Sequence, residues 1–184
     1  MISTKTASKA RQKNRIHVDL ELDYQIALPG YESRRVGETP EAGLPTEQQL
    51  VDWVCTVLEQ VDYQNAAQLT IRVVDNEEMT QLNETYRHKD GATNVLSFPF
   101  EAPAQIPLPL LGDVVICAPV VEQEAQQQHK TLMQHWAHMV VHGVLHLLGY
   151  DHITEAQAEQ MEHLEITILS RLGYANPYQI TELT

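Results

Sequence analysis

One stretch of about twenty residues, Thr131 to Tyr150, contains no Asp, Glu, Lys or Arg. A run of this length folds as a helix that either crosses a membrane or lies buried inside a protein. Four histidines and Gln134 lie within it, and these polar side chains favour a buried helix of a soluble protein. We therefore expect a core helix at 130–149, and the rest of the chain must supply the layers that cover it.

The patterns around this helix predict a small mixed β-sheet with further helices, an α+β fold. Apolar and polar residues alternate from Ile16 to Leu28, which is the period of a half-buried strand. Thr46 and Asp75 are typical helix N-caps, and Gly149 and Gly173 stand where helix C-caps are expected. Further strands are predicted at 69–75, 95–100 and 111–119, and further helices at 47–61, 76–86, 119–128 and 154–172.

Charged residues are distributed unevenly along the chain. Twelve Lys and Arg against 25 Asp and Glu give a net charge of −13, which excludes a broad basic surface that grips nucleic acid. Five of the twelve basic residues lie within the first 15 residues, which contain no acid. We expect residues 1–15 to form a disordered basic arm, 16–175 a single domain and 176–184 a C-terminal tail, with a Gly- and Pro-rich linker at 28–45.

The two cysteines, Cys55 and Cys117, are far apart and have the spacing of neither a zinc knuckle nor a disulfide framework. The basic arm lacks the apolar core of a secretory signal. We therefore expect a cytoplasmic protein without a membrane segment.

Five of the nine histidines lie between His135 and His152. On a helix, His142 and His146 are four positions apart and lie on one face, one turn from each other. Gly149 can take the left-handed conformation that lets the chain fold back and bring His152 to the same point. The motif H-x-x-x-H-x-x-G-x-x-H thus provides three imidazoles and leaves a fourth coordination position open, as in catalytic zinc sites.

This spacing predicts one Zn²⁺ per chain, held by His142, His146 and His152, although nickel or copper would also bind such a set of ligands. His135 and His138 fall on the same helical face. Both precede the loop that folds back, so we expect them to lie outside the ligand set.

Metzincin peptidases share this histidine spacing, but a Glu follows their first histidine and acts as the general base. Here that position is Gly143, so a peptidase mechanism lacks its base. Asp151 precedes the third ligand, His152. It either orients a ligand imidazole from behind or holds the turn through backbone contacts, and both interpretations stay open at this point.

A second cluster consists of Arg87, His88 and Lys89, which precede a turn at Asp90–Gly91. The planar guanidinium of Arg87 suits phosphate, because it donates two parallel hydrogen bonds and stays charged. Together with a metal ion it would focus positive potential within one cleft of an acidic protein. A solvated surface loop is the alternative interpretation of these residues.

Three segments taken together are similar to a known family: LNETYRHKDGATNVLSFPF (82–100), LGDVVICAP (111–119) and HWAHMVVHGVLHLLGYDH (135–152). They resemble the YbeY family of bacterial single-domain, metal-dependent endoribonucleases, which act in ribosomal RNA maturation. The resemblance extends from about Leu69 to Tyr174. It implies a mixed sheet flanked by helices, with a zincin-like zinc-binding helix in the C-terminal third. Zinc would lie at His142, His146 and His152, and the functional arginine of the family corresponds to Arg87.

On this resemblance we expect a hydrolase, a zinc-dependent endoribonuclease specific for single strands. It would mature the 3′ end of 16S ribosomal RNA and take part in ribosome quality control. Arg87 and His142 are the expected catalytic residues, and Arg87 and Lys89 are expected to bind substrate. The expected partners are ribosomal RNA and the ribosome, ribosomal proteins or assembly factors, with neither membrane nor DNA. The alternatives are a metallopeptidase and a non-catalytic zinc protein associated with the ribosome.

Overall fold

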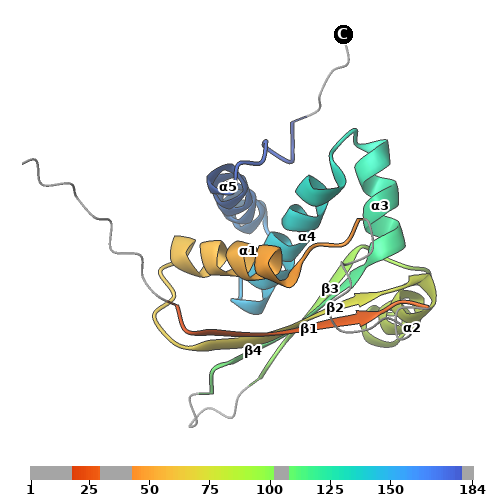
Figure 1. The fold of residues 1–184 in the computed structure, drawn as a ribbon, viewed down its shortest axis with the longest axis horizontal. Helices are drawn as coiled ribbons and strands as arrows, with labels where there is room; N and C mark the ends of the chain where they lie inside the picture. The colour runs from red at the N-terminus through yellow and green to blue at the C-terminus, as the bar shows by residue number, and fades with distance from the viewer. Residues whose placement is uncertain (1–17, 30–42, 102–107, 180–184) are drawn as a thin grey trace, which may run out of the picture.

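A mixed β-sheet forms the base of the molecule (Figure 1). The computed structural model describes residues 18–29, 43–101 and 108–179, and in these ranges the sheet has four strands in the order β1-β2-β4-β3. β1 pairs in parallel with β2, β2 pairs in parallel with β4, and β3 runs antiparallel to β4. The strands are β1 (Leu20–Ala27), β2 (Ala67–Val74), β3 (Val95–Pro99) and β4 (Leu110–Cys117).

The predicted N-caps of α1 and α2 and the glycines after α4 and α5 are found where the sequence places them. The Thr46 side chain accepts a hydrogen bond from the backbone of Gln49 at the start of α1, and Asp75 caps α2 in the same way. Gly149 and Gly173 follow the ends of α4 and α5 with φ values of 91° and 85°. The helices are α1 (Glu47–Gln60), α2 (Asn76–Arg87), α3 (Ala118–Gln127), α4 (Leu132–Leu147) and α5 (Glu155–Arg171).

Different helices cover the two faces of the sheet. α1, α4 and α5 lie over one face (Figure 1), where Ile71 and Val114 belong to the main core. On the opposite face, Leu96 and Val115 form a smaller core with Met79 of α2. The alternation of side chains along each strand separates the two cores, so the expected α+β fold, a mixed sheet flanked by helices, is confirmed.

α4 is the central helix of the main core, and 11 of its 16 residues are buried. It contacts β3, β4, α1, α3 and α5. This burial explains why the stretch contains no Asp, Glu, Lys or Arg, since each would need a partner inside the core. Within the described ranges, no helix has the length and hydropathy needed to cross a membrane.

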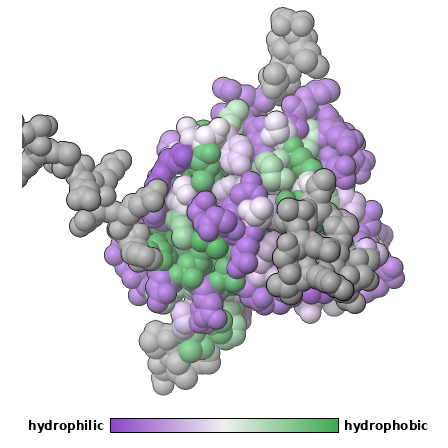
Figure 2. Space-filling view, viewed as in Figure 1, coloured by the Kyte–Doolittle hydropathy of each residue, from purple (hydrophilic) through white to green (hydrophobic). Residues whose placement is uncertain are grey.

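β1 is an edge strand with one buried and one open side. Leu20 and Leu22 pack against the main core, while Glu21 and Asp23 are exposed. Figure 2 shows mostly hydrophilic side chains on this view of the molecule, with apolar side chains gathered where β1 meets α1. The apolar and polar residues that alternate in the sequence of this strand therefore face the core and the solvent in turn.

Several predicted segment boundaries differ from those in the structure or lie outside the residues that the structure describes. The strand expected from Ile16 has its first paired residue at Leu20, and Ile16, the arm at 1–15, most of the linker and residues 180–184 lie outside the described ranges. The domain boundary at 175 stays a prediction. Beyond it, the backbone carbonyl of Pro177 accepts a hydrogen bond from Lys130 Nζ at 2.5 Å, so the start of the expected tail packs on the domain. Cys55 and Cys117 are both free thiols.

Candidate metal centre

The first two predicted ligands lie one turn apart on α4. The Nε2 atoms of His142 and His146 are 3.1 Å apart. Two nitrogen ligands of a tetrahedral zinc ion, each about 2.0–2.1 Å from the metal, are separated by about 3.3 Å. The helix therefore holds this pair close to ligand spacing.

The third imidazole comes from the loop between α4 and α5. Gly149 takes a positive φ immediately after the helix, and the chain turns back so that His152 approaches the other two rings. One ligand atom from each of His142, His146 and His152 lies within 4.8 Å of the other two. The His152 side chain is 55% exposed, so this side of the cluster is open to solvent. The predicted ligand triad is thus brought together, with room for a further ligand.

The outer nitrogens of the two helical histidines are held by oxygen acceptors. Nδ1 of His146 donates to the backbone carbonyl of Tyr150 at 2.9 Å, and Nδ1 of His142 lies 2.6 Å from a carboxylate oxygen of Glu165. A neutral imidazole that donates through Nδ1 presents a lone pair at Nε2. Two such lone pairs facing each other at 3.1 Å repel unless a cation lies near them, so the donor set fits a metal ion.

The protonation states agree with this assignment. Burial and the neighbouring imidazoles of His142 and His152 lower the pKa of His146. The neutral form of a histidine is the one that binds metal. His146 is therefore available as a ligand at neutral pH.

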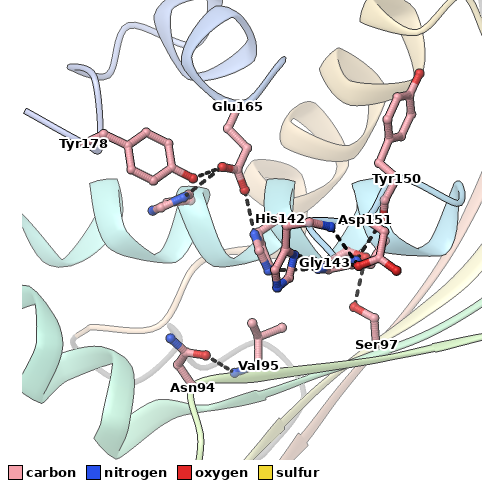
Figure 3. A network of polar contacts seen from close by, with 12 residues as sticks. Asn94, Val95, Ser97, His142, Gly143, Tyr150, Asp151, Glu165 and Tyr178 are labelled. Carbon is pink, nitrogen blue, oxygen red and sulfur yellow. Dashed lines mark hydrogen bonds and ion pairs between the residues drawn. The ribbon is translucent and has the colours of Figure 1, made fainter. Parts of the chain in front are cut away.

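Glu165 on α5 is a buried acid behind the site, with no exposed surface. Burial opposes its charged form, but the imidazoles of His138, at 3.6 Å, and His142, at 2.6 Å, outweigh this effect and lower the pKa of Glu165 to about 2. The Tyr178 hydroxyl donates to the same carboxylate, and Figure 3 shows Glu165 between Tyr178 and His142. A buried anion next to His142 favours a cation bound at the other nitrogen of that ring.

Glu165 was not among the residues predicted from the sequence, although a signal for it exists. It lies on the apolar stripe of α5 with Met161, Ile168 and Leu169, which are all buried. A lone carboxylate in such a stripe requires a buried partner, and the nearby histidine motif supplies one.

His135 and His138 do not belong to the group of three histidines whose ring nitrogens converge. Both are buried. His135 Nε2 lies 2.7 Å from the Glu124 carboxylate of α3, and His138 contacts Glu165. These two residues connect α4 to the helices on either side of it.

Gly143 allows α4 to approach the sheet closely. A Cβ atom at this position would lie 2.5 Å from Cγ1 of Val114, and the Gly143 carbonyl accepts a hydrogen bond from Ser97 Oγ at 3.0 Å (Figure 3). The position that bears the general base in metzincins therefore faces β3 and β4 here. A glutamate could not be accommodated there without moving the helix.

The three histidines open into a cleft of about 900 Å³. Arg87, the last residue of α2, lines the same cleft, so the structure brings this one residue of the second cluster to the three histidines. Lys89 is exposed and lies outside the set of lining residues. Asp151 lines the cleft and accepts a hydrogen bond from the backbone N–H of His152 at 2.8 Å, with 3.9 Å between its carboxylate and Nδ1 of that ring.

A mixed sheet covered by helices, with three convergent imidazoles and an arginine in one cleft, defines a class of single-domain metalloenzymes. The model of the YbeY endoribonuclease family matches residues 38–173, and the chain belongs to this family. The resemblance found in the sequence motifs is thereby confirmed. Membership supports a metalloenzyme of the hydrolase class, an endoribonuclease that acts in ribosomal RNA processing.

Among solved structures, the chain is similar to the solution structure of TM1509 from Thermotoga maritima, described as VT1, a NESGC target protein. The two sequences are 22% identical, the match covers 85% of this chain and 99% of that chain, and the TM-score is 0.48.

Proposed function

We propose that the protein is a zinc-dependent endoribonuclease that cuts single-stranded segments of ribosomal RNA. The observation that carries this proposal is the shared cleft, which is lined by His142, His146 and His152 and by Arg87. The Arg87 guanidinium, together with a metal ion on the three imidazoles, suits a phosphodiester, the anionic group that an endoribonuclease must bind.

Each residue of the site has a separate task. A zinc ion held by His142, His146 and His152 would supply Lewis-acid polarisation of a phosphoryl oxygen and activation of water near neutral pH. Arg87 binds the phosphate and neutralises the charge that develops on its oxygens. Glu165 fixes the ring of His142 through Nδ1, and so keeps Nε2 directed into the cleft.

The peripheral residues have supporting tasks. Lys89 follows Arg87 in the exposed loop after α2, where it would contact more distant phosphates of a longer RNA. Asp151 holds the turn that presents His152, since it accepts the His152 backbone N–H.

The net charge of −13 gives the protein little unaided attraction for RNA. We therefore propose that the ribosome, a ribosomal protein or an assembly factor brings it to its substrate, in the cytoplasm. Maturation of the 3′ end of 16S ribosomal RNA and ribosome quality control are the proposed processes.

The decisive experiment compares RNA cleavage by the wild type and by Arg87→Ala, purified identically and assayed with and without chelator. We expect chelator-sensitive cleavage by the wild type, and a large loss in Arg87→Ala at unchanged zinc content. Arg171→Ala is the matched control, because Arg171 on α5 pairs with Glu59 of α1 outside the cleft. Equal cleavage by Arg87→Ala and wild type would exclude the assigned role. Unfolded casein, assayed in parallel, tests the peptidase alternative, which Gly143 opposes.

A further inference from the structure

Two of the large apolar side chains that the structure leaves exposed border the catalytic cleft. Tyr86 is 61% exposed and Ile153 is 82% exposed. They come from different elements, since Tyr86 is on α2 and Ile153 lies in the loop before α5, and both line the cleft. Exposed apolar side chains that line a cleft are available to contact a bound ligand.

The Tyr86 ring contacts the ring of Phe98. Its centroid is 5.0 Å from that of Phe98 on β3, with an angle of 70° between the rings. In this edge-to-face arrangement, Phe98 is half-buried and fixes the Tyr86 ring, and most of the Tyr86 surface stays free. An aromatic ring that is fixed and still accessible is suited to stacking.

Tyr86 directly precedes Arg87, and consecutive Cα atoms are about 3.8 Å apart. Both side chains line the same cleft, so the ring and the guanidinium can reach groups of the same nucleotide or of two neighbouring nucleotides. In a duplex, the faces of a base are already stacked on its neighbours, whereas an unpaired base can be splayed out onto an aromatic side chain.

We propose that Tyr86 is the stacking platform for an unpaired nucleobase next to the phosphate bound by Arg87, with Ile153 as a second apolar contact. This inference rests on the proposed function, because it assumes that the cleft binds RNA. On this proposal, stacking on Tyr86 is the reason why the cleft prefers single-stranded RNA to duplex RNA.

Binding to a short, fluorescein-labelled, single-stranded 2′-O-methyl oligoribonucleotide, measured by fluorescence anisotropy, tests the proposal. Tyr86→Leu keeps an apolar contact with Phe98 but removes the aromatic face, and it should weaken binding about 5- to 150-fold. Tyr86→Phe should bind as the wild type does. Leu110→Ala is the matched control, because Leu110 is an exposed apolar residue outside the cleft.

Two further readouts separate stacking from a loss of structure or charge. An abasic nucleotide at one position of the oligonucleotide should weaken wild-type binding and leave Tyr86→Leu binding unchanged, because the same contact is already absent. Tyr86→Leu should also keep the salt dependence of the wild type, whereas Arg87→Ala should reduce it. Melting temperature and zinc content report whether each variant folds, and Ile153→Ser gives a second, independent variant at an exposed position.

Wild-type affinity in Tyr86→Leu, or weak binding in Tyr86→Phe, would overturn the stacking role. If the wild type still cleaves RNA in a chelator-sensitive manner, only this inference fails. If the wild type neither binds nor cleaves RNA, the proposed function fails with it.

Discussion

Replacement of Glu165 by Gln tests whether the buried carboxylate supports the metal ligands. Gln keeps the shape of the side chain and can still accept one hydrogen bond from Nδ1 of His142, but it carries no charge. Hydrogen bonds to charged groups contribute about 1.5–3 kcal/mol and neutral ones about 0.5–1.5 kcal/mol. The exchange therefore removes about 1–1.5 kcal/mol of support for His142, and zinc affinity should fall roughly tenfold.

Competition with a chromogenic chelator measures this affinity directly, without recourse to RNA cleavage. Glu162→Gln is the matched control, because Glu162 is on the same helix and exposed. Glu165→Ala should bind zinc more weakly still, since both His142 and Tyr178 lose their acceptor. A folded Glu165→Gln protein with wild-type zinc affinity, or an equal loss in Glu162→Gln, would refute the reasoning.

Other predictions concern the ligands, the packing of α4 and the charge network behind it. His146→Ala should lose stoichiometric zinc, as measured by metal analysis, and retention of one ion per chain would contradict the ligand assignment. Chelation should lower the melting temperature of the wild type and leave that of His146→Ala unchanged. For zinc at 100 times its Kd, the loss of stability of the wild type is equivalent to about 2.7 kcal/mol. Gly143→Ala should destabilise the fold by about 1–3 kcal/mol through overpacking against Val114, and Gly143→Ala/Val114→Ala should recover part of the loss in chemical denaturation. Burial opposes the charge on Glu124, but its hydrogen bond with His135 helps lower its pKa below the ordinary value of 4.5. The stabilisation by the charged Glu124 is therefore present above pH 4.5 and lost as the pH falls through the folded pKa. The difference in the free energy of unfolding between the wild type and Glu124→Gln should thus become smaller as the pH is lowered.

The sequence predicted features that depend on local chemistry. The caps at Thr46 and Asp75, the turn at Gly149 and the histidine pair at positions 142 and 146 all follow from spacing along a single element. The structure shows these caps, this turn and this close pair of imidazoles.

The features that the sequence did not predict depend on contacts between distant elements. Glu165 approaches His142 only after α5 packs on α4, and the steric role of Gly143 exists only because Val114 lies beneath it. The order β1-β2-β4-β3 is likewise a property of tertiary pairing. The positions of Tyr86 and Ile153 at the cleft could not be predicted from the sequence, where each is only an apolar residue among polar ones. Such residues are common on protein surfaces.

The ligand set has a consequence for how metal binding and cleavage depend on the fold. His142, His146, His152 and Glu165 lie on α4, on α5 and in the loop between these helices, whereas Arg87 reaches the cleft from the end of α2. Metal binding therefore depends on how α5 packs on α4, and the position of Arg87 depends on how α2 packs on the sheet. A variant altered only where α2 meets the sheet would thus keep its metal and lose its activity.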